Sequence, residues 1–230
     1  SAKKYTGSSY IAYFQAYTNT YASLAYLEKL YMEAILHPDI RILSIATRPD
    51  CLSTEILDLL ERLNQIKPVW VELGLQTIHE RTARYIRRGY DLPVFETAVS
   101  ELRRRGIDVI VHTILCLPGE TKPDMLQTIQ YLNRQDIQGI KLQLLHILKD
   151  TDLAEIYASD PFPIPDPQEY YELLGACISH LRPDIVIHRL TGDGPKELLT
   201  APLWTCNKRQ VLNQLQSYFK THDIWQGKEY

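Results

Sequence analysis

Segments typical of β-strands alternate with segments typical of α-helices along nearly the whole chain, and this alternation restricts the fold more than any other feature. Runs rich in β-branched, aliphatic and aromatic residues predict six strands. They cover Tyr10–Tyr17, Ile40–Ala46, Val69–Leu75, Val109–Leu115, Ile140–Leu145 and Ile185–Leu190. Repeated strand–helix units predict an α/β fold with a parallel sheet, because the crossover between two parallel strands is long enough to hold a helix.

The segments between the strands carry apolar residues at helical spacing. Helices are predicted over residues 24–34, 54–63, 78–88, 94–105, 121–133, 169–181 and 208–218. Ser53 is placed to cap the second of them, and Thr121 and Asp124 have the spacing of a capping box. Prolines at alternate positions from Pro161 to Pro167 predict a loop.

Length, charge and cysteine content limit the class of protein. The chain has 230 residues, a formal net charge of −3 and no apolar run long enough to span a membrane. No apolar segment of a signal peptide follows its first residues, so we expect a cytoplasmic protein with no membrane partner. Its four cysteines are far apart in sequence and form no metal-binding motif, so each is expected to be a reduced, small apolar side chain.

The two faces of the strands favour a barrel over an open doubly wound sheet. The third strand has an apolar face and a polar face, which carry Val69, Val71, Leu73 and Leu75 and, respectively, Trp70, Glu72, Gly74 and Gln76. Lys141 and Gln143 share a face in the same way. Such a polar face does not fit a second layer of helices, and we expect it to line a lumen that binds a polar ligand. The alternative is that these side chains only satisfy one another.

In parallel α/β folds, ligands bind at the carboxyl ends of the strands. This rule selects candidates before any family is considered: Gln15, Thr18, Asn19, Thr47, Arg48, Asp50, Glu72, Gln76, His79, His112, Gly119, Glu120, His146, Lys149, Asp150, Arg189, Thr191 and Asp193. The set is rich in hydrogen-bond donors and acceptors and mixed in charge. It suits a zwitterionic ligand that carries a sugar.

Four of these positions and their neighbours carry more information. Glu72, within a strand, is costly to bury unless a cation or a ligand donor pairs with it. Arg88, after the following helix, either binds a carboxylate through two nitrogens or lies at the surface. His112 lies between apolar neighbours and is either a ligand contact or a hydrogen-bonded core histidine. Gly119 allows a close approach of the backbone to a ligand.

Six sequence motifs resemble a known superfamily. Three are similar to the radical S-adenosylmethionine (SAM) superfamily, in the branch of the elongator catalytic subunit and the anaerobic coproporphyrinogen oxidase: VELGLQT at 71–77, IRRGY at 86–90 and ILCLPGET at 114–121. Three more resemble an uncharacterised group of bacterial radical SAM proteins: FQAYTNTY at 14–21, TRPDCL at 47–52 and HRLTGDG at 188–194. One such motif is weakly specific, whereas six in order, over about Tyr10 to Tyr218, are strongly specific.

The resemblance implies an enzyme with two cofactors, S-adenosyl-L-methionine and a [4Fe–4S] cluster. In this family a CxxxCxxC loop after the first strand binds the cluster, and reduction by a partner such as flavodoxin or ferredoxin cleaves SAM to methionine and a 5′-deoxyadenosyl radical. The radical abstracts hydrogen from a substrate, and the barrel shields it from water.

Kinship to the elongator branch suggests tRNA as the substrate, with a wobble uridine as the target. The arginine clusters at 84–88 and 103–105 would then contact phosphates. The alternative is that these clusters are solvated helix ends, where cations suit the helix dipole.

The resemblance also implies roles for individual residues. Gln76 matches a position that hydrogen-bonds the SAM ribose, and His112 matches a position where relatives place a polar residue near it. Arg88 matches a position that pairs with the methionyl carboxylate. The carbonyls of residues 17–19 would bind the SAM amino group, and Gly119 lies in the turn beside the adenine. With the strand-end residues and Glu72, whose partner would be SAM or substrate, the expected cofactor-binding set is Gln15, Tyr17, Thr18, Asn19, Arg48, Glu72, Gln76, Arg88, His112 and Gly119.

The chain departs from the family pattern in two ways. It has no CxxxCxxC loop, so we expect an α/β fold that is a partial (β/α)6 barrel of parallel strands with outer helices, lacking the first strand and the cluster loop. We expect a truncated form of a longer protein, inactive on its own and without metal ligands. Second, Cys116 stands where a glycine usually precedes LPGE, and its side chain would narrow the adenine pocket.

The expected organisation is a linker over residues 1–9, a core barrel with a C-terminal helical extension over 10–221, and a tail over 222–230.

Two other functions fit the residues. One is a cluster-free α/β barrel lyase or isomerase with Glu72 and His112 as general base and acid. The other is a non-catalytic scaffold that binds SAM or a protein partner.

Overall fold

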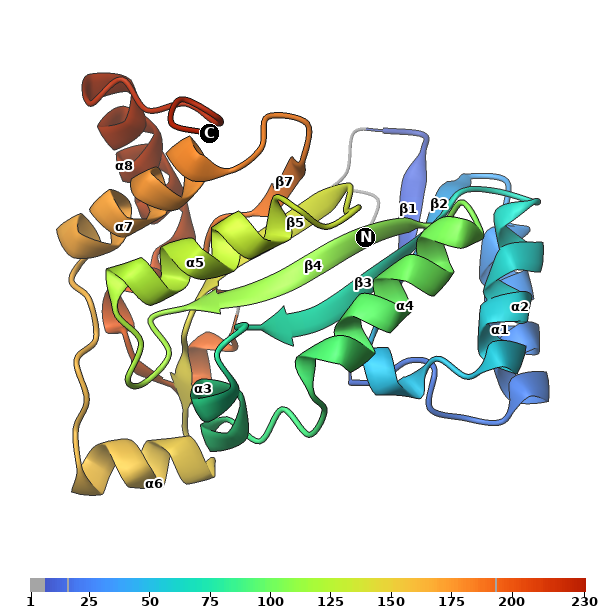
Figure 1. Cartoon of the computed structure of the whole chain (residues 1–230), viewed down its shortest axis with the longest axis horizontal. Helices are drawn as coiled ribbons and strands as arrows, with labels where there is room; N and C mark the ends of the chain where they lie inside the picture. Colours follow the sequence, from blue (N-terminus) through green and yellow to red (C-terminus); the bar gives the residue numbers. More distant parts are fainter. Residues whose placement is uncertain (1–6, 16, 193) are drawn as a thin grey trace. The chain divides into compact units, whose positions relative to one another are not determined.

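The computed structural model describes residues 7–15, 17–192 and 194–230, so the predictions for residues 1–6, Ala16 and Asp193 lie outside the described residues. Six strands of the described chain form a sheet in the order β1-β2-β3-β4-β5-β7, and β6 pairs separately with β8. In Figure 1, β1 (Tyr10–Phe14) pairs parallel with β2 (Ile40–Thr47), which pairs parallel with β3 (Val69–Gln76). The strands that follow one another along the chain are therefore neighbours in the sheet.

Contacts along the chain define two compact units. Among the described residues, unit 1 contains 7–15, 17–75, 90–111 and 135–139, and unit 2 contains 76–89, 112–134, 140–192 and 194–230. Each unit is described separately below. The predicted single core over residues 10–221, with its linker and tail, stays a prediction.

Unit 1 places three helices with the first strands of the sheet. They are α1 (Leu24–Ile35), α2 (Thr54–Asn64) and α4 (Leu92–Arg104), and the 3-10 turn η1 (Pro49–Cys51) precedes α2. Ser53 caps α2, since its hydroxyl accepts a hydrogen bond from the Ile56 amide at 3.4 Å. The apolar stripe of each helix is buried, and Tyr31, Leu60 and Phe95 have no exposed surface.

A buried arginine joins two helices of unit 1. The Arg105 side chain is 5% exposed and lies at the end of α4. It contacts Glu101 at 2.5 Å on its own helix, and Asp58 at 3.1 Å and Glu61 at 3.5 Å on α2. Three carboxylates around one guanidinium offset the cost of burying its charge.

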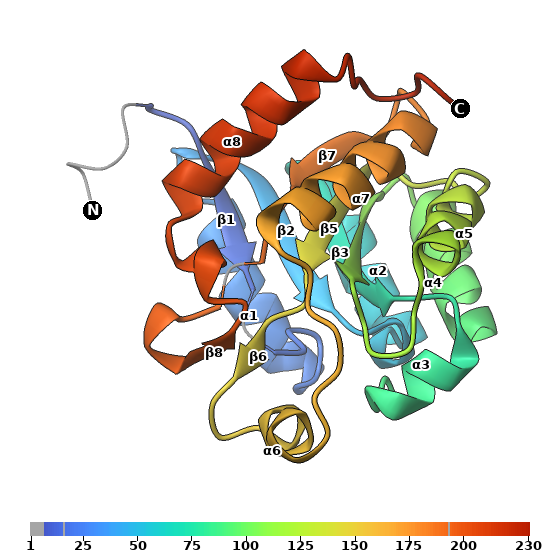
Figure 2. The ribbon, with the colours of Figure 1, turned by 90° about the vertical axis from the view of Figure 1, so that its left-hand side faces the viewer.

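Unit 2 contains the remaining helices and strands. Its elements are α3 (Glu80–Tyr85), the end of β4 (Asp108–Leu115), α5 (Lys122–Leu132), β5 (Gly139–Leu144) from Ile140, β6 (Ile147–Leu148), α6 (Asp152–Ser159), α7 (Pro167–His180), β7 (Val186–Arg189), η2 (Lys196–Leu198), β8 (Leu199–Ala201), η3 (Leu203–Cys206) and α8 (Lys208–Thr221). α7 packs against both α5 and α8 (Figure 2). Capping boxes begin α5 at Thr121 and α7 at Asp166.

The last nine residues pack on α7. The amides of Gly227 and Glu229 donate to the carbonyls of Ile178 and Ser179 at 3.2 Å and 2.8 Å. A Cβ atom added at Gly175 would lie 2.7 Å from the Cδ1 atom of Ile224, so a larger residue there would require the Ile224 side chain to move. These contacts belong to unit 2.

The predicted strands and helices are present, with two shorter elements. β1 ends at Phe14 rather than Tyr17, and Tyr17 itself has a left-handed φ of 60° and is 97% exposed. α3 covers residues 80–85 rather than 78–88, and left-handed φ angles at Arg87 and Gly89 follow it. The short elements β6, α6 and β8 were not predicted.

None of the helices in the described part of the chain is both long and apolar enough to cross a membrane.

Replacing Leu60 by alanine tests the core of unit 1. Leu60 has no exposed surface, so Leu60→Ala should lower the free energy of unfolding by about 2–5 kcal/mol through lost burial and a residual cavity. The matched control is Leu36→Ala, because Leu36 is 59% exposed and its loss should change that free energy by less than about 0.5 kcal/mol. Urea unfolding followed by circular dichroism measures both, and equal effects would contradict this account of the core.

Candidate functional site

The turn after β1 is held by the side chain of Asn19. Its amide nitrogen donates to the carbonyls of Phe14 at 3.0 Å and Ala46 at 2.8 Å, which ties the end of β1 to the end of β2. The Asn19 carbonyl accepts a short hydrogen bond from the buried hydroxyl of Tyr31, whose pKa is raised by burial. Asn19 thus positions the turn, and Gln15 and Tyr17, which precede it in the chain, are exposed.

Arg48 lies just after β2, within unit 1. Its guanidinium binds the Asp50 carboxylate through two nitrogens, at 2.9 Å and 2.7 Å, and stands 5.5 Å from the centre of the Tyr90 ring. The hydrogen bonds from Arg48 lower the pKa of Asp50. The predicted candidate is therefore held in a fixed orientation by two neighbours.

Glu72 is buried on β3, with 4% of its surface exposed. Its two carboxylate oxygens accept hydrogen bonds from the hydroxyls of Tyr13 at 2.7 Å and Ser44 at 2.8 Å, on β1 and β2. Sequence reasoning required a cation or a ligand donor for this carboxylate and missed these hydroxyls. The strand register places Ser44 opposite Trp70, two residues before Glu72 on β3, so Ser44 lies diagonally across from Glu72.

Gln76 is the last residue of β3 and Cys116 directly follows β4, and both have strained backbone conformations. Their φ angles are 63° and 64°, in the left-handed region that costs a residue with a side chain about 1 kcal/mol. Such strain at strand ends is typical of functional positions. The Gln76 side chain is half-buried, and the segment after it leads through Thr77 to α3.

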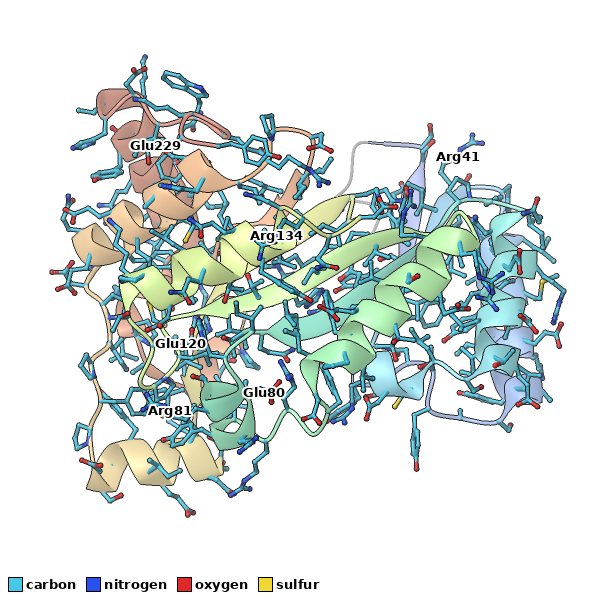
Figure 3. All side chains as sticks on the ribbon, in the orientation of Figure 1. Arg41, Glu80, Arg81, Glu120, Arg134 and Glu229 are labelled. Atoms are coloured by element: carbon cyan, nitrogen blue, oxygen red, sulfur yellow. The ribbon has the colours of Figure 1, made fainter. Side chains whose placement is uncertain are left out.

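A hydrogen-bond network in unit 2 connects the segment after β3 with the turn after β4. The Thr77 hydroxyl donates to Glu120 at 2.5 Å, and the Thr77 carbonyl accepts from Arg88 at 2.8 Å. The Arg88 guanidinium is 1% exposed and also contacts Glu80 at 2.9 Å. Figure 3 shows Glu80 on α3 and Glu120 in the turn before α5. Arg88 is thus a buried residue with partners in the protein, and its predicted binding of the methionyl carboxylate stays a prediction.

Gly119 lies in the turn with a φ of 81°, and the group that approaches it is Arg81 of α3 (Figure 3). The Gly119 carbonyl accepts from the Arg81 guanidinium at 3.1 Å, and an added Cβ would lie 2.8 Å from the same group. The group close to Gly119 is therefore an arginine of the protein, and the predicted close approach to a ligand stays a prediction. Its predicted place beside the adenine is untested.

His112 is half-buried on β4 and belongs to a polar row in unit 2. Its Nδ1 lies 3.5 Å from the Gln143 side-chain nitrogen on β5, and the Gln143 oxygen accepts from Arg189 on β7 at 3.4 Å. Lys141, which shares a strand face with Gln143, is buried. Sequence reasoning selected each of these residues separately, but it did not join them into one row.

A pocket of about 540 Å³ opens beside the turn after β4. Its lining combines that turn with the proline-rich loop and α7, and includes Cys116, Gly119, Glu120, Met125, Phe162 and Leu173. Burial raises the pKa of Cys116 to about 12, so the thiol is protonated at neutral pH. The same cause raises the pKa of Glu120.

Neither the sequence nor the described residues supply ligands for an iron–sulfur cluster. Cys51, Cys116, Cys177 and Cys206 are all free thiols, and no group of three or more His, Cys, Asp or Glu side chains in the described parts of the chain is placed to hold a metal ion. The donor set does suit SAM, because amide, hydroxyl, imidazole and backbone groups lie at the strand ends.

Comparison with known proteins identifies the family. The sequence profile of the Radical SAM superfamily matches residues 2–132, and that of the Radical SAM C-terminal domain matches residues 137–221. This chain belongs to the radical SAM superfamily. The predicted resemblance is confirmed, and the superfamily's cofactors are SAM and a [4Fe–4S] cluster whose ligands are not in this chain.

Three proteins illustrate the similarity. The chain is 39% identical to Bacillus subtilis YtqA over 98% of its own length and 70% of that protein, and 36% identical to Escherichia coli YhcC over 94% and 70%. The structure of Methanocaldococcus infernus Elp3 with an N-terminal deletion matches it with a TM-score of 0.80 at 16% identity, over 95% of this chain and 55% of that one. This likeness confirms the predicted α/β fold, a partial radical SAM-type barrel of parallel strands with outer helices.

Alkylation of cysteines tests the thiol environments. Because the pKa of Cys116 and of Cys177 is raised to about 12, roughly one molecule in ten thousand carries either thiolate at about pH 8. Iodoacetamide should therefore leave both residues largely unmodified in the folded chain, as peptide mass spectrometry can measure. The control is the urea-unfolded chain, in which all four cysteines should react. Fast labelling of Cys116 in the folded chain would contradict its burial.

The pH dependence of stability tests Glu120. Its pKa is raised by burial above the value in the unfolded chain, so its contribution to stability is full below about pH 4 and is lost as pH rises through the folded-state pKa. Glu120→Gln lacks this titration. The free energy of unfolding of the variant minus that of the wild type should therefore increase between about pH 4 and pH 7. A difference that stays constant across this range would contradict the assignment.

Proposed function

We propose that this chain is the SAM-binding core of an enzyme that cleaves SAM reductively and abstracts hydrogen from its substrate. The observation that carries the proposal is the polar carboxyl edge of the strands in a member of the radical SAM superfamily. Ligand sites of parallel α/β folds lie at this edge. The chain spans about 70% of the length of YtqA and YhcC, so the proposal concerns the full-length protein.

The residues proposed to hold SAM are those that the resemblance to the superfamily assigns. Gln76 would hydrogen-bond the ribose, with the polar His112 near it. The carbonyls of residues 17–19 would take the amino group, Arg88 the carboxylate, and the turn at Gly119 the adenine. The hydrogen bonds from Asn19 to the ends of β1 and β2 support a fixed backbone where the SAM amino group would bind. The ion pair between Arg48 and Asp50 supports an ordered backbone after β2.

The chemistry supplied by the bound cofactors is one-electron cleavage of SAM followed by abstraction of hydrogen from the substrate. The protein's own contribution is placement and exclusion of water. The network of Thr77, Arg88 and Glu120 serves placement, since it links the backbone after β3 to the turn after β4. No ligands for the cluster are present here, so we expect this chain alone to be inactive.

A tRNA substrate, a reductant such as flavodoxin or ferredoxin, and a cytoplasmic location stay predictions. The arginine clusters that would contact phosphates have partners in the protein. Arg87 contacts Asp152 at 2.5 Å, and Arg103 contacts Asp108 at 3.1 Å. These pairs favour the helix-end interpretation of the clusters over phosphate binding.

A cluster-free lyase would use Glu72 as a base, and the two hydroxyls that donate hydrogen bonds to the Glu72 carboxylate disfavour that role.

The deciding experiment uses the full-length protein, reconstituted without oxygen with iron and sulfide and then given dithionite and SAM. Formation of 5′-deoxyadenosine supports the proposal. A protein that takes up no cluster and cleaves no SAM would refute it and would favour the non-catalytic scaffold.

Substitution of Gln76 tests the ribose contact. Gln76→Ala removes one hydrogen bond, so the dissociation constant of SAM, measured by isothermal titration calorimetry on the full-length protein, should rise about threefold to tenfold. Gln210→Ala, on the exposed side of α8, is the matched control and should leave the constant unchanged. An unchanged constant in Gln76→Ala would remove this residue from the site.

A further inference from the structure

Another pocket of unit 2, of about 850 Å³, has aromatic walls and is called the aromatic pocket below. It is formed by α7, η3 and α8, and α7 and α8 pack against each other (Figure 2). Tyr171 of α7, Trp204 of η3, Tyr218 of α8 and His222, the residue after α8, contribute rings to its lining. None of the lining residues belongs to the set expected to hold SAM, so this pocket has no function in the proposal above.

Contacts within the protein hold these rings in fixed orientations. The Trp204 indole nitrogen donates to the Pro165 carbonyl at 3.1 Å, and the Trp204 ring meets the Tyr171 ring edge-on, with the ring centres 6.4 Å apart. Tyr218 stacks on His222 with the ring centres 3.9 Å apart. Trp204 and Tyr218 are half-buried, so part of each ring is exposed. Fixed, partly exposed rings form a surface on which a planar ligand can stack.

Two glutamines of α8 add hydrogen-bond donors to the aromatic pocket. Gln210 and Gln214 lie one helical turn apart, and both line the pocket. The Gln214 oxygen accepts from the Tyr171 hydroxyl at 3.0 Å, and the Gln210 oxygen accepts from the Asn207 side-chain nitrogen at 3.0 Å. Both interactions use the amide oxygen, so the Nε2 groups remain as donors for a ligand.

The charge of the aromatic pocket excludes several kinds of ligand. Among the described residues that line it there is no lysine or arginine, and the only carboxylate is Asp166. Asp166 caps α7, where it accepts from the Glu169 amide at 2.9 Å. A phosphate or carboxylate would find no cationic partner here. An organic ammonium ion has donors only, and the two glutamine nitrogens are also donors. The lining therefore favours an uncharged, planar ligand with acceptor atoms on its edge.

We propose that the aromatic pocket binds a nucleobase that carries carbonyl oxygens, namely uracil, cytosine or guanine. The base stacks on the rings of Tyr218 and Trp204, and the nitrogens of Gln210 and Gln214 donate to its oxygens. Adenine has no carbonyl oxygen, so the adenine of SAM is a poorer match. The base comes from a free nucleoside or from single-stranded RNA. This inference does not rest on the proposed cleavage of SAM.

Titration of the 230-residue chain with uridine tests the stacking surface. In isothermal titration calorimetry at about pH 7.5, the wild type should bind uridine at one site. Tyr218→Leu keeps apolar bulk but removes the ring, so the dissociation constant should rise about fivefold to a hundredfold. Tyr218→Phe keeps the ring and should bind as the wild type does. Equal affinities of Tyr218→Leu and the wild type would overturn the proposal.

The variant Gln214→Glu tests the donors. It has the same shape and keeps an acceptor for the Tyr171 hydroxyl, but an oxygen replaces the donor nitrogen, so uridine binding should weaken about tenfold. Gln216→Glu makes the same change on an exposed residue of α8 that does not line the pocket, about 200° further round the helix, and should bind as the wild type does. Unchanged circular dichroism and melting temperature exclude a folding defect. Guanosine should bind in the same way as uridine and adenosine more weakly, and stronger binding of adenosine would overturn the assignment to carbonyl-bearing bases.

A single-stranded hexamer of uridylate distinguishes the two sources of the base. Binding of the hexamer at least about tenfold tighter than uridine, weakened by Tyr218→Leu, supports RNA, and similar affinities for the two support a free nucleoside. If neither uridine, guanosine nor the hexamer binds, or if Tyr218→Leu and Gln214→Glu bind them as the wild type does, the proposal is overturned. Binding of tetramethylammonium that requires Tyr218, without binding of any base, would identify a cation site and would also overturn it.

Discussion

The structure depends on strands that are apolar on one face and polar on the other. In β3 the residues Val69, Val71, Leu73 and Leu75 are almost completely buried, and their burial provides much of the driving force that keeps helices on that side. The opposite face is thereby free to carry Glu72 and Gln76. A strand in an ordinary doubly wound sheet would be apolar on both faces. The polar side chains would be costly there, and here they are satisfied by one another or available to a ligand.

Satisfaction within the protein is the rule for most of these polar groups. The carboxylate of Glu72 is bound by two hydroxyls, Arg88 by a carbonyl and a carboxylate, and Arg48 by an aspartate and an aromatic ring. Such networks fix the rotamers of the side chains before any ligand arrives. Fixed rotamers would serve the proposed radical chemistry, because a mobile side chain that brought a C–H bond close to the radical would lose hydrogen in place of the substrate.

Much of the fold was predictable because period-2 and period-3.6 patterns are strong here. The alternating residues of β3, the cap at Ser53 and the capping box at Thr121 are local signals, and the structure has all of them. The two-residue strand β6 and its partner β8 could not be found this way, since their pairing joins residues about fifty positions apart. The early end of β1 depends on a left-handed residue, Tyr17, where no glycine marks the turn.

The candidate site was predictable residue by residue but not as an arrangement. The strand-end rule selected Arg48, Glu72, His112 and Arg189 from position alone. It could not show that Tyr13 and Ser44 bind Glu72, or that Gln143 joins His112 to Arg189, because those contacts depend on the stagger between strands. The superfamily assignment rests on order and spacing of motifs, which the profile matches confirm over residues 2–132 and 137–221.

The packing of the last nine residues has a practical consequence for how the chain is divided. The family profile ends at residue 221, yet Ile224 fills the space over Gly175, and the backbone of Gly227 and Glu229 is bound to α7. A protein that ended at residue 221 would lose the Ile224 side chain and with it the apolar cover over Gly175 of α7. A protein that ends at residue 221 would therefore aggregate more readily than one that extends to residue 230, because apolar surface of α7 would be exposed to solvent.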